Sequence, residues 1–244
     1  MSTRFNILSN YKNCTAFTLA EVLITLGIIG VVAAMTMPAV IKNYKKHVTE
    51  TKLKSAYSQI SQLLEKVNYE NDMMFAPAEL SEYAGYNYNL SDAVFKKYFA
   101  PYIKIVKELN KNDRFNICNY QGEGCYKNTS YKCVITSNNI GLCFVIEPTS
   151  GRLSIQIITE PSKDVVYAGK DAFAFTVPRD IRENNYNLNL SHLLSTLELS
   201  DETVKTYCTS VNAFPNGKQD REFFCTVLIY KNGWKIPKDY PVRF

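Results

Sequence analysis

Residues 16–38 read AFTLAEVLITLGIIGVVAAMTMP, and this stretch decides how the rest of the chain is organised. From Phe17 to about Ile41 the run is apolar on nearly all sides, which is long enough to cross roughly 30 Å of hydrocarbon. One carboxylate, Glu21, interrupts the run close to its start. Because an ionised side chain in a membrane segment costs roughly 2.5–3.5 kcal/mol on insertion scales, Glu21 indicates a function and requires a partner.

The order of these residues resembles the processing motif of type IV prepilins and of type II secretion pseudopilins. A short polar leader, Ala16, the FTLAE of residues 17–21 and the apolar run carry the resemblance. It implies that a prepilin peptidase cuts between Ala16 and Phe17 and then N-methylates Phe17. It also implies that Glu21 pairs with the amino terminus of a neighbouring subunit and that Pro38 kinks the helix. Ala16 stands where the family usually has glycine, and it is also small.

Elementary electrostatics supports this role for Glu21. Opposite charges attract strongly in a low dielectric, and an unpaired carboxylate is penalised there. Cleavage before Phe17 creates the cation that Glu21 lacks, so assembly becomes conditional on processing. The alternative is an ordinary secretory signal, for which the mature chain would begin near Met35 or Pro38.

A second helical pattern follows the apolar run. Apolar residues recur at spacings of three and four, namely Leu53, Ala56, Tyr57, Ile60, Leu63, Leu64 and Val67. This stripe predicts an amphipathic helix whose apolar side packs on a globular head. We expect one helix from Phe17 to about Tyr69, on the order of 80 Å long at 1.5 Å per residue. The alternative is two helices with a break near Pro38 or Asn43.

Beyond residue 130 the sequence pattern changes to a period of two, which is typical of strands. The predicted strands are Lys132–Thr136, Leu142–Ile146, Arg152–Thr159, Ala172–Val177 and Glu222–Tyr230, with the Asn-Gly at 232–233 as a hairpin turn. Short turns join the first four strands without intervening helices, so the sheet should be antiparallel. Two short helices are predicted as well, one capped by Ser91-Asp92 and ending near Pro101, and one opening at Ser200.

The fold class that these patterns predict is α+β and pilin-like. A long N-terminal α-helix, with a transmembrane half and an amphipathic half, packs on a C-terminal antiparallel β-sheet head. The expected domains are a leader peptide at 1–16, a transmembrane and assembly helix at 17–41, its amphipathic continuation at 42–70 and an extracytoplasmic head at 71–244.

The cysteines indicate an oxidising compartment for the head. Of the seven, Cys14 lies in the predicted leader, and six follow the membrane segment: Cys118, Cys125, Cys133, Cys143, Cys208 and Cys225. Six cysteines allow 15 pairings. We favour pairing between near neighbours, with Cys208–Cys225 as the first choice. The alternative is a metal site, but there is no Cys-x-x-Cys and both His47 and His192 are far from any cysteine in sequence, so no metal is expected.

Charge and motifs argue against several function classes. The formal net charge of +5 is small and scattered, so we expect no nucleic acid partner. No phosphate loop, nucleophile elbow or zinc-binding helix motif occurs, so we expect neither an enzyme nor a cofactor. Lysines flank both sides of the apolar run, which leaves orientation ambiguous on charge alone. The even cysteine count and the family resemblance both place the C-terminal part outside.

The predicted function is therefore that of a structural subunit of a type IV pilus or a type II secretion pseudopilus-like filament. The partners would be a prepilin peptidase, other pilin or pseudopilin subunits and the inner membrane. The protein would cross the inner membrane once and later join a periplasmic or cell-surface filament. The alternative is a membrane-anchored extracellular binding protein or enzyme that uses the helix only as an anchor and does not need Glu21.

Overall fold

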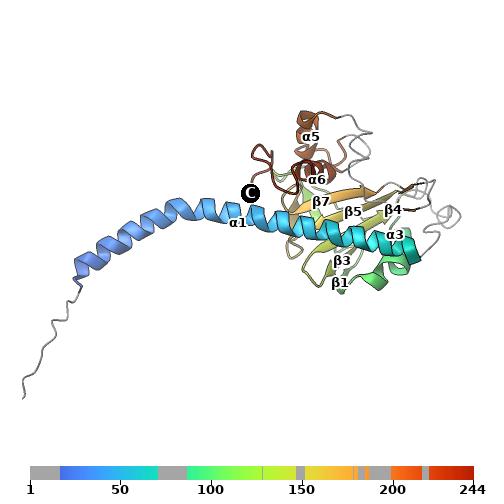
Figure 1. Ribbon diagram of the computed structural model, residues 1–244, viewed down its shortest axis with the longest axis horizontal. Helices are drawn as coiled ribbons and strands as arrows, with labels where there is room; N and C mark the ends of the chain where they lie inside the picture. The colour runs from blue at the N-terminus through green and yellow to red at the C-terminus, as the bar shows by residue number, and fades with distance from the viewer. Residues whose placement is uncertain are drawn as a thin grey trace, which may run out of the picture. The chain divides into compact units, whose positions relative to one another are not determined.

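A computed structural model describes residues 17–70, 87–127, 129–146, 152–177, 179–180, 185–186, 199–215 and 220–244. The chain divides into two compact units, Met1–Tyr44 and Lys45–Phe244. Helix α1, Leu19–Glu70, is a single α-helix of 52 residues and contributes to both units (Figure 1). The prediction of one continuous helix is confirmed. Pro38 lies inside α1, and the alternative break near Pro38 or Asn43 does not occur.

In the second unit the predicted apolar stripe of α1 forms part of the core. Its buried members are Leu53, Ala56, Ile60, Leu63, Leu64 and Val67, and Tyr57 is partly buried against them. This half of the helix lies along the sheet, as Figure 1 shows. A polar contact adds to the packing, because Lys52 Nζ donates to the main-chain oxygen of Thr159 at 2.6 Å. An amphipathic helix thus buries its apolar side where the sequence predicted it.

The sheet beneath α1 has five strands in the order β1-β3-β4-β5-β7, and every pair is antiparallel. The strands are β1 Ile105–Leu109, β3 Lys132–Thr136, β4 Gly141–Ile146, β5 Leu153–Ile158 and β7 Ala172–Val177. The last four confirm the predictions. Strand β1 was not predicted because it is an edge strand with three exposed residues in a row and so lacks clear alternation.

Both faces of the sheet are covered. On the α1 side Ile155, Phe173 and Phe175 join the larger core, together with residues of the helices. On the other side Val145, Ile158 and Ala172 join a smaller core with Phe115 and Ile117 and others. Because both faces are buried, the strands are more apolar than a half-exposed sheet requires.

The remaining elements surround this sheet. They are α3 Tyr88–Val94, the π-helical turn η1 Phe95–Phe99, the 3-10 turn η2 Ala100–Tyr102, the parallel pair β2 Asn116–Cys118 and β6 Val165–Tyr167, the pair β8 Arg179–Asp180 and β9 Asn185–Tyr186, and α5 Asp201–Cys208. Ser200 caps α5 as predicted, accepting from Thr203 N at 3.2 Å. The cap of α3 was predicted wrongly, because Asn87 performs it and Ser91 lies inside the helix.

The prediction of a strand at Glu222–Tyr230 is wrong, because this segment forms helix α6, Arg221–Lys231. Every residue from Arg221 to Ile229 is buried. A helix that is buried all round shows no amphipathic period, so its β-branched and aromatic residues resemble those of a buried strand.

The Asn-Gly after α6 ends a helix and does not form a hairpin. Gly233 has φ +66°, and its N–H donates to Tyr230 O at 3.0 Å while Trp234 N donates to Ile229 O at 3.0 Å. These two bonds make a Schellman motif, which requires a left-handed residue and therefore favours glycine.

Three disulfides join near neighbours in the head. They are Cys118–Cys125, Cys133–Cys143 and Cys208–Cys225, separated by 7, 10 and 17 positions. The second links directly opposite residues of β3 and β4. The third links α5 to α6, and both of its cysteines are fully buried. The pairing between near neighbours that the sequence favoured is the pairing that the structure has.

Candidate processing and assembly site

The predicted processing point lies at the first described residues. Ala16 lies outside the described residues. Phe17 is 86% exposed, and α1 begins two residues later, at Leu19. An exposed position ahead of a regular helix is geometrically accessible to a peptidase.

Glu21 takes part in a capping box at the start of α1. Both the N–H and the hydroxyl of Thr18 donate to Glu21 Oε2 at 2.8 Å, and Glu21 N donates to Thr18 Oγ1 at 3.2 Å. This reciprocal pattern satisfies N–H groups that have no partner within the helix. The role of Thr18 was not predicted, although the Thr-x-x-Glu spacing at 18–21 is the sequence signal for it.

The contact with Thr18 engages only one oxygen of the Glu21 carboxylate. Among the described residues, Oε2 has two donors and Oε1 has none. The carboxylate is therefore held in one orientation while Oε1 can accept a further hydrogen bond. An amine is the donor that would also neutralise the charge.

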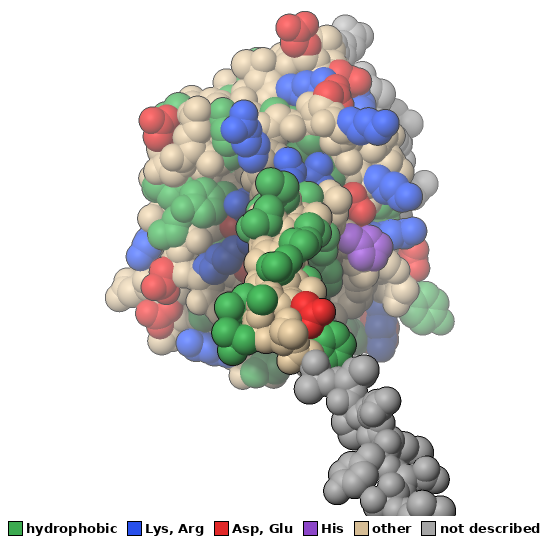
Figure 2. Space-filling view, turned by 90° about the vertical axis from the view of Figure 1, so that its left-hand side faces the viewer, with side chains coloured by type: hydrophobic (Ala, Val, Ile, Leu, Met, Phe, Trp, Pro, Cys, Tyr) green, Lys and Arg blue, Asp and Glu red, His purple; other side chains and the backbone are tan. Residues whose placement is uncertain are grey.

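The helix that follows Glu21 has an apolar surface that nothing covers within the first unit. Exposed apolar residues are Phe17 and Leu19 before Glu21, and after it Val22, Leu23, Ile24, Leu26, Ile28, Ile29, Val31, Val32, Met35, Met37, Val40 and Ile41. By length and composition α1 can cross a membrane, and none of its most apolar window is buried. Figure 2 shows hydrophobic side chains over the visible face of this part of the helix, with one acidic group among them.

Two glycines lie on this apolar helix. At both Gly27 and Gly30 a Cβ atom would meet nothing within 4 Å. Small residues on an uncovered apolar helix permit close approach of another helix. The predicted kink at Pro38 stays a prediction.

The head contains a buried charged network that the sequence did not predict. Arg221 is 0% exposed, and its Nη1 and Nη2 donate to four main-chain oxygens at 2.7–3.1 Å, those of Ser210, Val211, Ile117 and Gly124. The side chain thus fastens the loop of the first disulfide and the end of α5 to the start of α6. Its acceptors are as far as 104 positions away in sequence, so no local pattern predicts them.

Two carboxyl groups lie beside Arg221. Burial, and then the charge of Asp220, raise the pKa of Glu222 to about 8. Burial also raises the pKa of Asp220 to about 6, against hydrogen bonds from Gln156 at 3.0 Å and Tyr131 at 3.2 Å. The network is buried, and its hydrogen bonds join α6 to the sheet and to the disulfide loop.

Metal binding finds no support in the described parts of the chain. No three side chains of His, Cys, Asp or Glu come together there as a metal site.

Two family models match the chain, one over its N-terminal part and one over the rest. The family model of the prokaryotic N-terminal methylation motif matches residues 11–37, and this motif is the signature of type IV pilins and pseudopilins. A second model, described as a family of unknown function (DUF6613), matches residues 39–244. The chain belongs to the DUF6613 family. No curated protein and no solved structure matches the chain at a significant level.

This DUF6613 protein therefore has a type IV pilin-like N-terminus, and the rest of the chain matches the DUF6613 family model. The methylation motif and the apolar helix indicate a membrane-anchored, single-pass protein of structural type. The head supplies an α+β fold with a pilin-like layout, in which a long N-terminal helix precedes an antiparallel sheet.

Proposed function

We propose that this DUF6613 protein is a structural subunit of a type IV pilus or of a type II secretion pseudopilus-like filament. The observation that carries the proposal is the methylation motif at the start of an uncovered apolar helix whose first turn holds Glu21. A soluble protein would bury such a surface, since exposed apolar area is unfavourable in water. In a filament, the helices of neighbouring subunits bury it.

Processing comes first in this proposal. A prepilin peptidase cleaves between Ala16 and Phe17 and methylates the new amino group of Phe17. The exposure of Phe17 supports this step. Cleavage places an ammonium group directly before the capping box of Thr18 and Glu21.

Assembly follows from the chemistry of that turn. Glu21 Oε1 of one subunit accepts a hydrogen bond from the amino terminus of the next, while Thr18 keeps the carboxylate oriented through Oε2. A paired charge in a low dielectric escapes the penalty of an isolated one, so the pair fixes the stagger between subunits. Gly27 and Gly30 allow the helices to approach closely.

The location follows from the disulfides and the membrane segment. Before assembly the protein crosses the inner membrane once, with its head on the extracytoplasmic side. Disulfides form and persist in such oxidising compartments, and the head has three. The assembled filament is periplasmic or on the cell surface.

The experiment compares two variants that separate the charge of Glu21 from its capping role. Glu21→Gln keeps the capping box, because glutamine also serves at this position, but removes the charge. Thr18→Ala removes the cap and keeps the charge. Mass spectrometry should find N-methylated Phe17 in the wild type and in both variants. We expect Thr18→Ala to assemble, and Glu21→Gln to stay in the membrane fraction as processed monomer.

Two results would contradict the proposal. A mature chain that begins near Met35 or Pro38 would indicate ordinary signal cleavage. Normal function of Glu21→Gln without any filament would favour a membrane-anchored binding protein or enzyme. If Thr18→Ala fails to assemble as well, the start of the helix is what assembly requires, and the charge of Glu21 has no separate role.

A further inference from the structure

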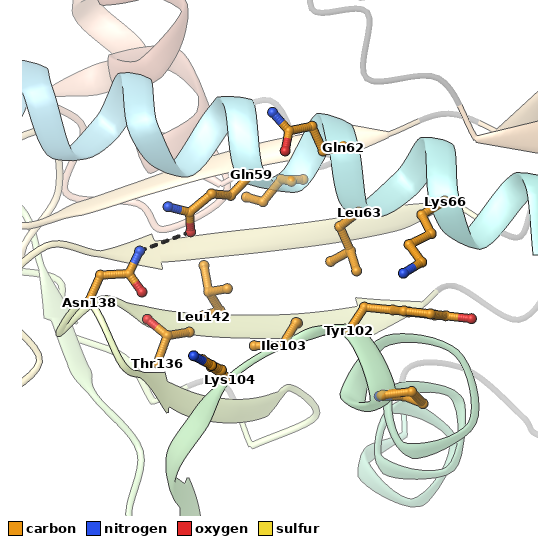
Figure 3. Close-up of a pocket in the computed structure, with 12 residues that line it drawn as sticks. Gln59, Gln62, Leu63, Lys66, Tyr102, Ile103, Lys104, Thr136, Asn138 and Leu142 are labelled. Carbon is orange, nitrogen blue, oxygen red and sulfur yellow. Dashed lines mark hydrogen bonds between the residues drawn. The ribbon is translucent and has the colours of Figure 1, made fainter.

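A groove of about 560 Å³ lies in the head between the C-terminal half of α1 and the segment that leads into β1 (Figure 3). Its floor is aliphatic, formed by Ile60, Leu63 and Leu142, with Ile103 beside them. In Figure 3 the side chains of Leu63, Leu142 and Ile103 lie in the space between helix and strands. A floor of this kind accepts an aliphatic side chain.

The charged side chains that line the groove are both lysines, Lys66 and Lys104. Lys66 makes an ion pair with Glu70 at 3.9 Å, but both side chains are about half exposed. Such a pair contributes little and can be exchanged for another. Lys104 is exposed, and no acidic side chain among the described residues lies within ion-pair distance of it. The groove thus offers two ammonium groups to an anionic ligand.

Carboxamides at the rim add hydrogen-bonding capacity. Asn138 Nδ2 donates to Gln59 Oε1 at 3.0 Å, which joins the turn between β3 and β4 to α1 (Figure 3). This bond uses one of the two Nδ2 hydrogens and leaves Asn138 Oδ1 able to accept. A carboxamide with a donor and an acceptor matches a main-chain amide, which also has one of each.

The same contacts argue against other anionic ligands. A saccharide that stacks on an aromatic ring is disfavoured, because Lys66 Nζ lies 4.8 Å from the centre of the Tyr102 ring and covers one of its faces. The Tyr102 hydroxyl already donates to Glu70. An inorganic anion would make no use of the aliphatic floor. A peptide uses all three features.

We propose that this groove binds an extended acidic peptide of a partner protein. An aliphatic side chain lies on the floor, flanking carboxylates reach Lys66 and Lys104, and a main-chain amide pairs with Asn138. Charge complementarity supports this occupant, since Lys66, Lys104 and the neighbouring Glu70 together carry a net positive charge. The proposal concerns the head alone and holds whether or not the protein forms filaments.

The test uses the full chain in a zwitterionic detergent and a fluorescein-labelled peptide, acetyl-Glu-Leu-Glu-Leu-Glu-amide. Fluorescence polarisation should give saturable binding that weakens as salt is added, because charge pairs between exposed groups are screened. The double variant Lys66→Gln/Lys104→Gln should bind about tenfold more weakly. The same peptide with glutamine in place of each glutamate should lose a similar factor.

Lys54→Gln is the matched control, because Lys54 is an exposed lysine of α1 that does not line the groove. It should leave the affinity unchanged. Absence of saturable binding, equal affinity for the glutamine peptide, or an equal loss in Lys54→Gln would each overturn the proposal. So would displacement of the peptide by millimolar inorganic phosphate or by an acidic polysaccharide, since the groove would then recognise charge alone.

Discussion

Tyr126 donates its hydroxyl hydrogen to Oε2 of Glu222 at 3.1 Å, across 96 positions of sequence. Tyr126 directly follows the Cys118–Cys125 disulfide, and Glu222 lies in the first turn of α6. The bond therefore ties the disulfide loop to the C-terminal helix. Because Glu222 is fully buried, its carboxyl group favours the protonated form.

This burial predicts a head whose stability falls as the pH rises. The pKa of Glu222 is about 8 in the folded head, above its ordinary value of 4.5. The folded state thus keeps a proton that the unfolded chain has released, so the contribution of this group to stability is full below pH 4.5 and is lost as the pH rises toward 8. Each pH unit between the two pKa values corresponds to about 1.4 kcal/mol. Glu222→Gln should remove most of this loss.

The measurement is the urea midpoint of the full chain in detergent at pH 5, 7 and 9. The wild-type midpoint should fall with pH more steeply than that of Glu222→Gln. Glu123→Gln is the control, because Glu123 is exposed and its variant should follow the wild type. Parallel pH profiles of wild type and Glu222→Gln would contradict the prediction. Asp220, whose pKa burial raises to about 6, contributes a smaller fall at lower pH.

Arg221→Lys should destabilise the head by about 1–3 kcal/mol, the range for leaving a buried hydrogen-bonding group without its partner. An ammonium group cannot reproduce the planar fork that bonds to four carbonyl oxygens. Chemical denaturation measures the loss. Hydrogen exchange should also increase first around Ile117 and Val211, the residues that the guanidinium holds. Arg243→Lys, at an exposed arginine, should change neither quantity, and equal behaviour of the two variants would disprove this role.

The extent to which the sequence predicted the fold follows from how each element is buried. The α1 stripe from Leu53 to Val67 was readable because one side of the helix is buried and the other is not. Strands β5 and β7 are buried on both faces, and they were readable because large apolar side chains on the α1 face alternate with Ser154 and Gln156 in β5 and with smaller side chains in β7. Helix α6 was misread because it is buried on all sides, and its Asn-Gly end then looked like a hairpin turn.

The motif at the start of α1 was recognisable for a different reason. Phe17 and Glu21 belong to a local motif, and the Thr18–Glu21 bonds span only three positions. The network of Arg221 was not predictable, because its partners are brought together only by the complete fold. The groove at Lys66 and Lys104 is likewise a product of tertiary packing, since α1 and the segment before β1 are distant in sequence.

Gly233→Ala should lower the free energy of unfolding by about 1–2 kcal/mol, the cost of a left-handed conformation in an L-residue. The reason is conformational, because φ at Gly233 is +66° and an added Cβ would meet no atom within 4 Å. Gly233→Asn is the matched control, since asparagine tolerates this region better and should lose less. Chemical denaturation compares the two. Equal losses would mean that some other property of the side chain, and not its backbone preference, decides stability here.

The three disulfides should differ in their resistance to reduction, because their accessibility differs. Cys125 is exposed, whereas both cysteines of Cys133–Cys143 and of Cys208–Cys225 are buried. Thiol–disulfide exchange requires access to a sulfur atom, so a mild thiol reductant should open Cys118–Cys125 first in the native protein. Alkylation followed by mass spectrometry identifies the reduced pair. In denaturant all three should react at similar rates, which controls for intrinsic reactivity. Native reduction of Cys208–Cys225 ahead of Cys118–Cys125 would show that α5 and α6 separate readily and that their packing does not protect the bond.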